Sequence, residues 1–542
     1  MSSPVARRYH DRTAHSPHSV HTSGHTLDWD VKPFPFKVYT ELPPLPLPRE
    51  IEPVSTDTLE AIATPATRRA EALSLAGLAA LLYYSAGVTK KQTYPGGGEV
   101  LFRAAPSTGA LYQTEVYLAA GAGAGLEPGL YHFCPGDFVL RRLRDGDVRE
   151  ALARAAADGS IARRAATVVL TAIFWRNTWK YQARGYRHLF WDSGTMLGNL
   201  LAVTGGLGLA PRLVTGFVDA DVNRLLGLDA AREAALELVA LGPDGPPAPP
   251  ASAIEEINHA FIPLSSSEVD YPLLREVHAA SALDTPEDVR AWRDAGRAPG
   301  PPRPPRQSPA RAVPPGSMSD RPAETRVSAG AAPALVALPP HREAAGRSLG
   351  ETIQRRASTR EFGRAPLSAV ELATALRAAT RGLEADVPAT LVDLYLIVNA
   401  VEGVPSGAYF YRPEDHALEV IRAGDFRRES ASLCLEQPLG GDAAAVVYFI
   451  APLDGMLAVF GDRGYRLANL LAGIAGGRAY LAAYALGFGA TGLTFYDGHV
   501  IEFFSPHAAG KDAIFVVALG RSAGAGRATI VGNSILPRRP SA

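Results

Sequence analysis

Cysteine is nearly absent from this sequence of 542 residues, which contains only Cys134 and Cys434. Because each stands alone, no CxxC redox or zinc motif is present, and the low count favours a reducing compartment. The first residues, MSSPVARRYHDRTAH, lack the apolar core of a signal peptide. Apolar runs such as MLGNLLAVTGGLGLA are interrupted well short of the roughly 20 residues that span a bilayer. We therefore expect a cytoplasmic protein without a membrane span.

An excess of charge of one sign is also missing, since 54 basic and 55 acidic residues leave a formal net charge of −1. Such a chain has no general attraction to nucleic acid or to an anionic membrane, so each cluster of arginines is judged locally. GxSxG, HExxH and Walker motifs are absent as well. Their absence excludes the common hydrolase, zinc and nucleotide-phosphate classes.

Histidines near the N-terminus invite a metal site, because they follow one another at spacings of three to five residues. They are His10, His15, His18, His21 and His25. No second type of ligand and no rigid scaffold stands beside them in the sequence. We expect no metal.

What the sequence does contain is an internal repeat. After a shift of 294 residues, three leucines of the later copy fall on three of the earlier one: Leu367, Leu372 and Leu376 on Leu73, Leu78 and Leu82. Further along the shift is about 278 residues, and two pairs of segments match: GLEPGLYHFCP from Gly125 with GVPSGAYFYRP from Gly403, and GYR from Gly185 with GYR from Gly464. The repeat sets the domain count at two, where length alone would suggest three or four.

The organisation that follows has five parts. They are an extended N-terminal arm (1–50), repeat 1 (51–245), a connector (246–345), repeat 2 (346–530) and a C-terminal tail (531–542). The arm is rich in histidine and proline, which predicts an extended strap on a globular surface. The middle of the connector, GRAPGPPRPPRQSPARAVPPGS, is too rich in proline for helix or sheet. The part ahead of it, from Ser252 to Ser281, keeps apolar periodicity and is expected to pack back onto repeat 1.

Secondary structure has the same order in both copies. Helical runs precede short β runs, namely EVYLAA, TVVLTAIF, DLYLIV, AAVVYFIAP and AIFVVAL. This order predicts an α+β fold with a buried sheet in each copy.

The two copies differ in the residues that can carry chemistry. Repeat 2 has RRASTR, in which four polar side chains crowd one short stretch: Arg355, Arg356, Ser358 and Arg360. The matching stretch of repeat 1 is AIATPAT. Conversely, repeat 1 has PSTGALY, whose first residues are Pro106, Ser107, Thr108 and Gly109, where repeat 2 has only VPATLV. Two half-sites are thus split between the repeats, although each motif alone also fits a solvated helix end or an ordinary turn.

With these motifs the chain resembles the flavin-dependent nitroreductase superfamily, and within it the SagB-type azoline dehydrogenases of thiazole and oxazole peptide biosynthesis. The resemblance extends to the arm, where YHDRTAH and LDWDVKPFPFKVY are similar to that group's N-terminal extension. It implies two nitroreductase-like domains fused as a pseudo-dimer, with one FMN at their interface. RRASTR and PSTGALY would complete that site, and the symmetry-related site would be derelict.

The residue types suit this cofactor. A flavin phosphate carries close to two negative charges, and each charge-assisted hydrogen bond from a guanidinium group contributes about 1.5–3 kcal/mol. Arg355, Arg356 and Arg360 supply such donors and Ser358 adds a hydroxyl. The small residues of PSTG would let the backbone approach the flavin ring.

GFGATG, with Gly487, Gly489 and Gly492, satisfies the dinucleotide-binding pattern literally. We reject a Rossmann site, because the preceding GGRAYLAAYAL is typical of a helix and the pattern requires a strand there. The resemblance instead places this loop near the flavin ring, through Gly489, Ala490, Thr491 and Gly492. After the last strand, Arg521 and Arg527 are further candidate phosphate ligands, and solvated arginines fit those positions equally well.

The resemblance also implies the catalytic pair, because azoline dehydrogenases carry a Lys-Tyr motif that Lys180 and Tyr181 match. The aligned residues of repeat 2 are Val459 and Phe460. A lysine whose pKa is lowered by burial can take a proton from carbon, and a tyrosine can relay it. In the alternative, Lys180 is exposed and Tyr181 belongs to the core. The GYR triplet that follows is expected to be structural, because it recurs without the pair.

The sequence therefore predicts an FMN-dependent dehydrogenase that oxidises azoline rings to azoles in a ribosomally made peptide, with oxygen as the electron acceptor implied by the family. The expected partners are the precursor peptide and a cyclodehydratase complex. Two alternatives stay open: an NAD(P)H-dependent reductase of nitro groups or quinones, and a non-catalytic scaffold of a peptide-modifying complex.

Overall fold

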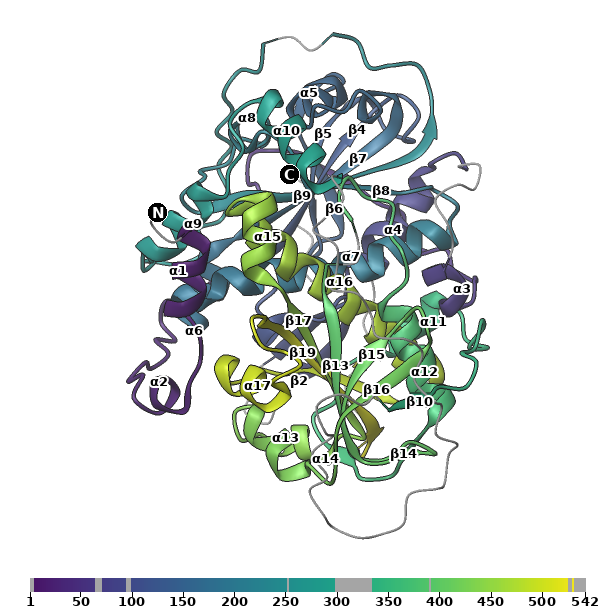
Figure 1. Ribbon diagram of the computed structural model, residues 1–542. Coiled ribbons are helices and arrows are strands. Elements are labelled where there is room, and N and C mark those ends of the chain that lie inside the picture. The colour runs from purple at the N-terminus through teal and green to yellow at the C-terminus, as the bar shows by residue number, and fades with distance from the viewer. Residues whose placement is uncertain are drawn as a thin grey trace.

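The two repeats form two lobes of mixed helix and sheet, stacked one above the other in Figure 1. The computed structural model describes residues 4–63, 71–93, 99–250, 253–297, 334–388 and 391–524, and the backbone of 529–530. None of the helices in these ranges is long and apolar enough to cross a bilayer.

The sheet of repeat 1 has seven strands and is antiparallel throughout. In spatial order they are β1 (Pro44–Pro46), β6 (Val139–Asp145), β5 (Gly129–Cys134), β4 (Thr114–Ala120), β7 (Arg164–Ile173), β9 (Glu233–Asp244) and β8 (Arg212–Val214). Every residue of β4 and β5 is buried, as expected for short continuous apolar runs in a covered sheet.

The sheet of repeat 2 has the same plan. Its path runs β10 (Leu335–Ala337), β16 (Ala417–Ala423), β15 (Gly407–Arg412), β13 (Asp393–Val398), β17 (Ala445–Ala451), β19 (Asp512–Ser522) and β11 (Phe362–Gly363), with β18 (Gly489–Gly492) also paired to β19. The five predicted β runs fall in β4, β7, β13, β17 and β19, so the predicted strands are confirmed. Two smaller sheets pair β12 (Leu367–Ser368) with β14 (Val401–Glu402), and β2 (Val88–Thr93) with β3 (Glu99–Arg103) and β20 (Thr529–Ile530).

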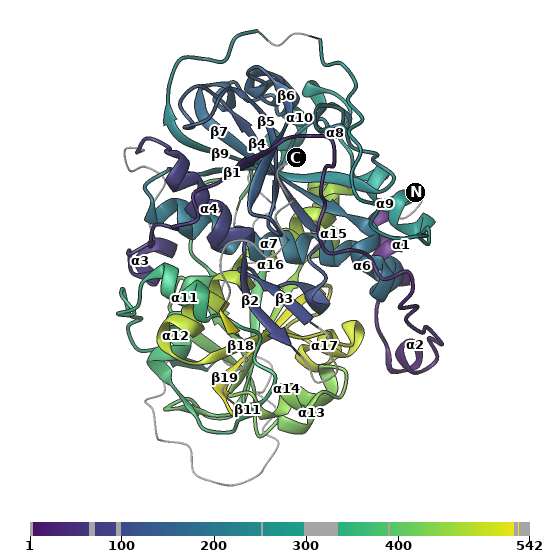
Figure 2. The same ribbon diagram turned by 180° about the vertical axis from the view of Figure 1, so that it is seen from behind.

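The helices correspond in the same way. Repeat 1 contains α3 (Thr58–Ala63), α4 (Leu75–Ala86), α5 (Arg149–Ala155), α6 (Phe174–Tyr181), α7 (Gly185–Gly206) and α8 (Asp219–Leu226). Repeat 2 contains α11 (Leu349–Arg355), α12 (Ala369–Ala379), α13 (Arg427–Leu433), α14 (Pro438–Asp442), α15 (Leu453–Phe460), α16 (Arg463–Leu486) and α17 (Asp497–Phe504). The β2–β3 hairpin reaches from repeat 1 alongside repeat 2, as Figure 2 shows from behind.

The long helices α7 and α16 cross in the middle of the molecule through glycine. A Cβ atom built on Gly194 would lie 2.8 Å from the Cα of Gly473, and one built on Gly198 would lie 3.1 Å from the Cα of Gly477. Only glycine permits so close an approach. Both pairs join residues that are equivalent in the two repeats, which is the contact expected on a two-fold axis.

Two buried ion-pair clusters tie the repeats together around this crossing. Asp497 of repeat 2 accepts hydrogen bonds from Arg184 and Arg187 of repeat 1. The equivalent Asp219 of repeat 1 accepts from Arg463 and Arg466 of repeat 2, each at 2.6 Å. Although burial alone would raise it, these two guanidinium groups lower the pKa of Asp219 to about 2. The GYR triplets are therefore structural, as predicted.

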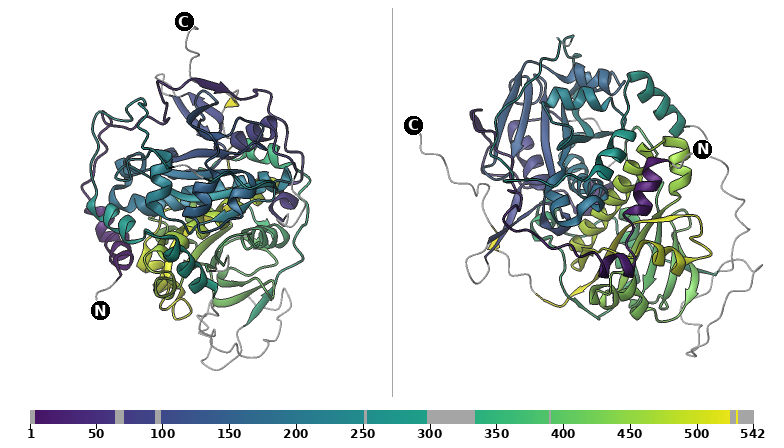
Figure 3. Two further views of the ribbon diagram at one scale, coloured as in Figure 1. Left: turned by 90° about the horizontal axis from the view of Figure 1, so that it is seen from above. Right: turned by 90° about the vertical axis from the view of Figure 1, so that its left-hand side faces the viewer.

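The arm corrects one expectation. It is not extended throughout, because it begins with α1 (Val5–Arg12) and α2 (Pro17–His21). On α1, Ala6 and Tyr9 are fully buried, and Tyr9 donates a hydrogen bond to the carbonyl of Ala183. The helix lies beside α15 (Figure 3). The expectation rested on the proline and histidine content of the arm and overlooked the apolar residues on one face of this segment. These residues form a helix because they pack against the rest of the protein.

The connector contributes α9 (Pro272–Ala280) and α10 (Pro286–Arg297). Leu274 and Val277 of α9 are buried. The Nδ1 of His278 lies 3.4 Å from the hydroxyl of Tyr186 in repeat 1, and its backbone carbonyl accepts a hydrogen bond from the guanidinium group of Arg466 in repeat 2 at 2.8 Å. The front of the connector thus packs against both repeats. Most of the proline-rich middle lies outside the described residues.

Candidate active site

The RRASTR segment lies directly beside the GATG strand. It begins at the end of α11 and runs along β18, where the backbone N–H of Thr359 donates to the carbonyl of Ala490 at 2.9 Å. The contact is tight, because a Cβ atom on Gly489 would meet the Thr359 hydroxyl. Tyr480 of α16 connects the two, since its hydroxyl accepts from the backbone N–H of Gly492 and lies 3.5 Å from the hydroxyl of Ser358. Both motifs of repeat 2 therefore meet at one place.

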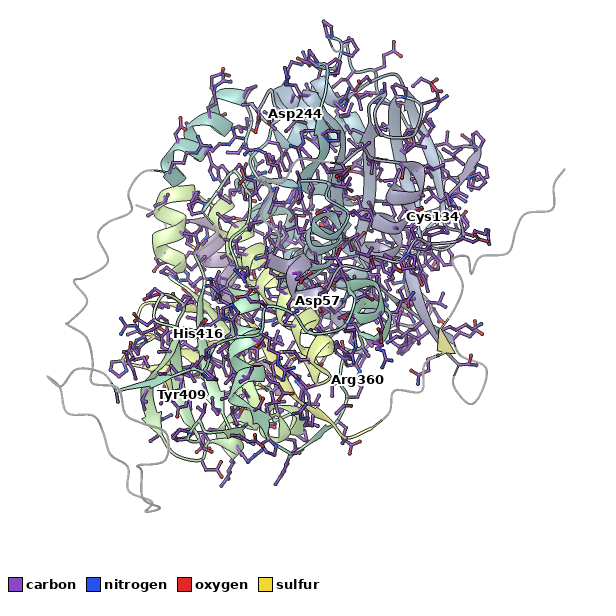
Figure 4. All side chains as sticks on the ribbon, turned by 90° about the vertical axis from the view of Figure 1, so that its right-hand side faces the viewer. Asp57, Cys134, Asp244, Arg360, Tyr409 and His416 are labelled. Atoms are coloured by element: carbon purple, nitrogen blue, oxygen red, sulfur yellow. The ribbon has the colours of Figure 1, made fainter. Side chains whose placement is uncertain are left out.

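The arginines of the basic cluster have different surroundings. Arg356 is buried and donates to the carbonyls of Arg103 and Ala104, at 3.0 and 2.8 Å, so it ties repeat 2 to the strand that precedes PSTG. Arg355 is exposed and forms an ion pair with Glu351. Arg360 is exposed at the margin of repeat 2 (Figure 4), and no carboxylate among the described residues pairs with it.

The other two predicted phosphate ligands are Arg521 and Arg527. Arg521 is half-buried and donates to Glu371 at 2.8 Å. Arg527 lies outside the described residues. Arg521 directly follows Gly520, which pairs with Gly489 of the GATG strand, and its guanidinium group is engaged by Glu371.

The PSTG loop is held by one buried carboxylate, Asp192 of α7. Asp192 accepts from the hydroxyl of Ser107 at 2.5 Å, from the backbone N–H and hydroxyl of Thr108 at 2.8 and 2.7 Å, and from the side-chain amide of Gln113 at 2.7 Å. Burial raises the pKa of Asp192 to about 6, although these hydrogen bonds act in the opposite direction. The loop turns through Gly109, whose φ of 65° favours glycine. Pro106 is tied down as well, because its carbonyl accepts from Thr195.

The Lys-Tyr pair closes the site from the end of α6. A Cβ atom on Gly109 would lie 2.8 Å from the hydroxyl oxygen of Tyr181, so the loop and this side chain are in contact. The Nζ of Lys180 lies 5.4 Å from the centroid of the Tyr181 ring. Burial lowers the pKa of Lys180, and the charges of Arg360 and Lys32 lower it further. The structure thus brings together Lys180, Tyr181, the PSTG loop and Arg360.

His188 lies against Tyr181 and was not anticipated. Its ring meets the Tyr181 ring edge-on, with centroids 4.6 Å apart, and its Nδ1 is 2.9 Å from the amide oxygen of Asn177. Burial lowers the pKa of His188 well below its usual range, so the ring is neutral. A neutral, fixed imidazole orients the tyrosine without adding charge.

Lys90 of β2 is a second residue that the sequence did not single out. Its Nζ donates to the carbonyls of Arg355 and Arg356, at 2.9 and 2.6 Å, and so caps the end of α11. Burial and the charge of Arg356 lower the pKa of Lys90 to about 8. In the sequence VTKKQT it resembles an ordinary solvated lysine.

The symmetry-related position is covered by the connector. Phe460, the equivalent of Tyr181, packs against Trp292 of α10 with ring centroids 5.4 Å apart, and its carbonyl accepts from the indole N–H at 3.1 Å. Gly296 of the same helix also lies against the Phe460 ring. Parts of the matching half-motifs, 64–67 and 389–390, lie outside the described residues.

No group of three or more histidine, cysteine, aspartate or glutamate side chains in the described part of the chain is arranged to hold a metal ion.

Comparison with known proteins identifies this arrangement. A family described as the nitroreductase family matches residues 51–242 and 353–520, one region in each repeat. The crystal structure of a nitroreductase-named protein from Anabaena variabilis is 28% identical, with a TM-score of 0.73, and the match covers 96% of this chain and all of that one. The match confirms the predicted α+β fold with two copies of one domain.

Two curated proteins match shorter regions. The nitroreductase-named protein MJ1384 of Methanocaldococcus jannaschii is 32% identical over 164 residues, which are 28% of this chain and 82% of that protein. The microcin B17-processing protein McbC of Escherichia coli is 30% identical over 135 residues, which are 23% of this chain and 48% of McbC.

Proposed function

Because the chain belongs to the nitroreductase family and fuses two of its domains, we propose that it is an FMN-dependent dehydrogenase of the SagB type, which oxidises azoline rings to azoles in a ribosomally made peptide. The observation that carries this proposal is the contact of Tyr181 with the PSTG loop, together with a neighbouring Lys180 whose pKa is lowered by burial and by the charge of the unpaired Arg360. The similarity to McbC, a microcin-processing protein, supports a peptide as substrate.

The residues present fit FMN. Arg360 offers a guanidinium group that no carboxylate neutralises among the described residues, and the Ser358 hydroxyl stands beside it. Arg356 has already committed two donors to backbone carbonyls, so its first role is to position the segment. We assign the phosphate to Arg360 and Ser358 with help from Arg355, and the flavin ring to the PSTG loop and the GATG strand.

The chemistry divides between the cofactor and the chain. FMN, when bound, would supply the acceptor for a hydride from one ring carbon of the azoline. Lys180 removes the proton from the neighbouring carbon, since its lowered pKa increases the neutral fraction that can act as a base. Tyr181, fixed by Gly109 and His188, shares or relays that proton.

One FMN per chain is part of the proposal. It is supported by α10, which covers the position around Phe460 where the second site would need open space. The precursor peptide and a cyclodehydratase complex are the proposed partners. A cytoplasmic location fits the free, buried state of Cys134 and Cys434.

A second candidate function is an NAD(P)H-dependent reductase of nitro groups or quinones. The nitroreductase names of MJ1384 and of the Anabaena variabilis protein favour it. Fast anaerobic bleaching of the bound flavin by NAD(P)H would support this candidate.

The deciding experiment incubates the FMN-loaded protein with an azoline-containing peptide in air. Mass spectrometry should show the loss of two hydrogen atoms per ring. An unchanged peptide, together with rapid bleaching by NAD(P)H, would replace the dehydrogenase with the reductase.

A further inference from the structure

A segment of the arm, residues 27–34, forms a wall beside the candidate active site. Leu27 and Val31 pack on the small apolar cluster of Leu111, Trp175 and Trp179, against which Tyr181 also packs. The wall is fixed by hydrogen bonds to the rest of the protein. Three backbone carbonyls accept these bonds. The indole N–H of Trp179 donates to the carbonyl of Asp28 at 2.7 Å, and the hydroxyl of Ser265 donates to the carbonyl of Val31 at 2.7 Å. The backbone N–H of Phe34 donates to the carbonyl of Leu264 at 2.6 Å.

Lys37, which follows the wall in the arm, anchors the chain inside repeat 1. Its Nζ lies 2.6 Å from a carboxylate oxygen of Glu233 and 2.9 Å from the hydroxyl of Tyr117, and the side chain is buried. The position of the wall is therefore set at both ends. Residues that it exposes present a fixed surface to the site.

Trp29 is the most conspicuous of these residues. Its side chain is 65% exposed, more than any other large hydrophobic residue in the described part of the chain. One edge rests on Trp179, with ring centroids 5.3 Å apart. The Nζ of Lys32 lies 5.2 Å from the Trp29 ring centroid. An aromatic side chain held in place and left exposed beside a site is typical of a binding surface.

Both signs of charge occur along this wall, because Asp28, Asp30 and Lys32 are all exposed. Lys32 and Arg360 each lie near Lys180, since the charges of both lower the pKa of Lys180. None of the three pairs with a carboxylate among the residues that the structure describes. The Asp28 carboxylate accepts from the N–H of Asp30 within its own turn, and the described residues show no ion pair between Lys32 and Asp28 or Asp30. Cations without a carboxylate partner beside a site are available to bind an anionic ligand.

The proposed cofactor and base account for two of these cations, since Arg360 is assigned to FMN and Lys180 acts in its neutral form. Lys32 is left over. Because an ammonium group is a compact point charge, it suits a single carboxylate more than the planar, bidentate contact that arginine makes.

We propose that Trp29 and Lys32 form a substrate subsite, which binds a carboxylate-bearing residue of the peptide next to the reacting ring. Lys32 pairs with the carboxylate, and the exposed face of Trp29 packs on the apolar stem of that residue. This subsite rests on the proposed function, because it presumes a peptide whose ring reaches Lys180. The carboxylate comes either from an acidic side chain or from the C-terminus of the peptide.

The test measures binding rather than turnover. Fluorescent pentapeptides that contain a thiazole, the product ring, cannot react and report affinity by anisotropy with the FMN-loaded protein. Four probes are compared: Glu or Gln directly after the thiazole, each with a free or an amidated C-terminus. The free and amidated forms distinguish the two sources of the carboxylate.

We expect the wild-type protein to bind the acidic probe about threefold to fivefold more tightly than the neutral one, the range of an exposed ion pair. Lys32→Glu should remove or reverse this preference, and Trp29→Ala should weaken all probes. Arg290→Glu makes a similar change of charge at an exposed residue of α10, which pairs with Glu287, and should leave the preference intact.

FMN content and circular dichroism of each variant must match the wild type; Lys32→Gln, which keeps the length of the stem, replaces Lys32→Glu if the latter folds poorly. Equal binding of all probes, no binding of any probe, or an unchanged preference in both Lys32 variants would overturn the subsite. A preserved preference without azoline oxidation by the wild type would instead overturn the proposed function and leave Trp29 and Lys32 as a binding site for acidic peptides only.

Discussion

The hydroxyl oxygens of Thr58 and Thr352 lie 2.7 Å apart. The two residues are separated by 294 positions, the shift that relates the early parts of the repeats. Contact between equivalent residues means that a pseudo-two-fold axis passes between them, and the neighbouring Asp57 lies between the two lobes in Figure 4. Each chemical environment near the axis therefore occurs twice, with different residues in each copy.

Flavin stoichiometry tests this asymmetry. We expect about one FMN per chain, because only one of the two related positions combines the basic segment, the PSTG loop and a tyrosine where the other copy has Phe460 covered by α10. Extraction of the flavin from protein of known concentration measures the ratio. A ratio near two would show that α10 does not block the second position.

Arg360→Ala should weaken FMN binding by roughly one to two decades, since the loss of a charge-assisted hydrogen bond costs about 1.5–3 kcal/mol. Titration of the flavin-free protein with FMN measures the dissociation constant. Arg364→Ala is the matched control, because Arg364 is exposed in the same segment and pairs with Asp442. Equal losses in both variants would place the phosphate elsewhere.

Lys180→Ala and Tyr181→Phe should retain FMN while azoline oxidation falls by about two orders of magnitude or more, the usual scale for loss of a general base. Val459 and Phe460 hold the equivalent positions and cannot accept a proton, so repeat 2 provides no rescue. Full activity of both variants would make the pair a packing feature. Colourless variants would assign it to the cofactor site instead.

Asp192 gives a prediction about pH. Burial raises its pKa to about 6 from an ordinary value of 3.8, so the folded state holds the proton more tightly than the unfolded state. Its contribution to stability is therefore fully present below about pH 4 and is lost as the pH rises through 6. Relative to Asp192→Asn, the flavin-free wild type should become more stable as the pH falls from 7 towards 4, by up to about 3 kcal/mol.

Urea unfolding of both proteins at a series of pH values measures this difference, and other carboxylates cancel in the comparison. A constant difference would mean that Asp192 titrates normally. In the same variant the PSTG loop loses part of its anchor, because an amide group cannot accept all four hydrogen bonds, so FMN affinity should fall at neutral pH.

The crossed ion pairs predict matched effects in the two repeats. Asp219→Ala and Asp497→Ala each leave two buried arginines without a carboxylate, and each should destabilise the protein by about 3–5 kcal/mol. Thermal unfolding compares the two variants. A large effect at one position only would show that one repeat alone supports the interface.

The fold was predictable because repetition and apolar periodicity are local signals. The strand DLYLIV became β13 and AIFVVAL part of β19 as expected. The helix α1 was missed, because its partners, Ala183 and Asp462, are far away in the sequence. Its stability depends on that packing rather than on helix propensity.

The candidate site was only partly predictable for a similar reason. The motifs of Arg360, Lys180 and Gly109 stand out in the sequence, and the structure brings them together. Asp192 and His188 do not stand out, although a carboxylate within the apolar stretch FWDSGTMLGNLL was an available signal. Their roles depend on contacts across 84 and 7 residues respectively, from Asp192 to Thr108 and from His188 to Tyr181, which no linear pattern specifies.

The covering of Phe460 by α10 has a consequence for how such a protein evolves. In a homodimer of identical chains, a helix that blocks one active site blocks both, and selection removes it. When the two copies are joined in one chain, each can mutate without the other. One copy can then give up its site and gain a supporting helix in its place, while the other keeps the reaction.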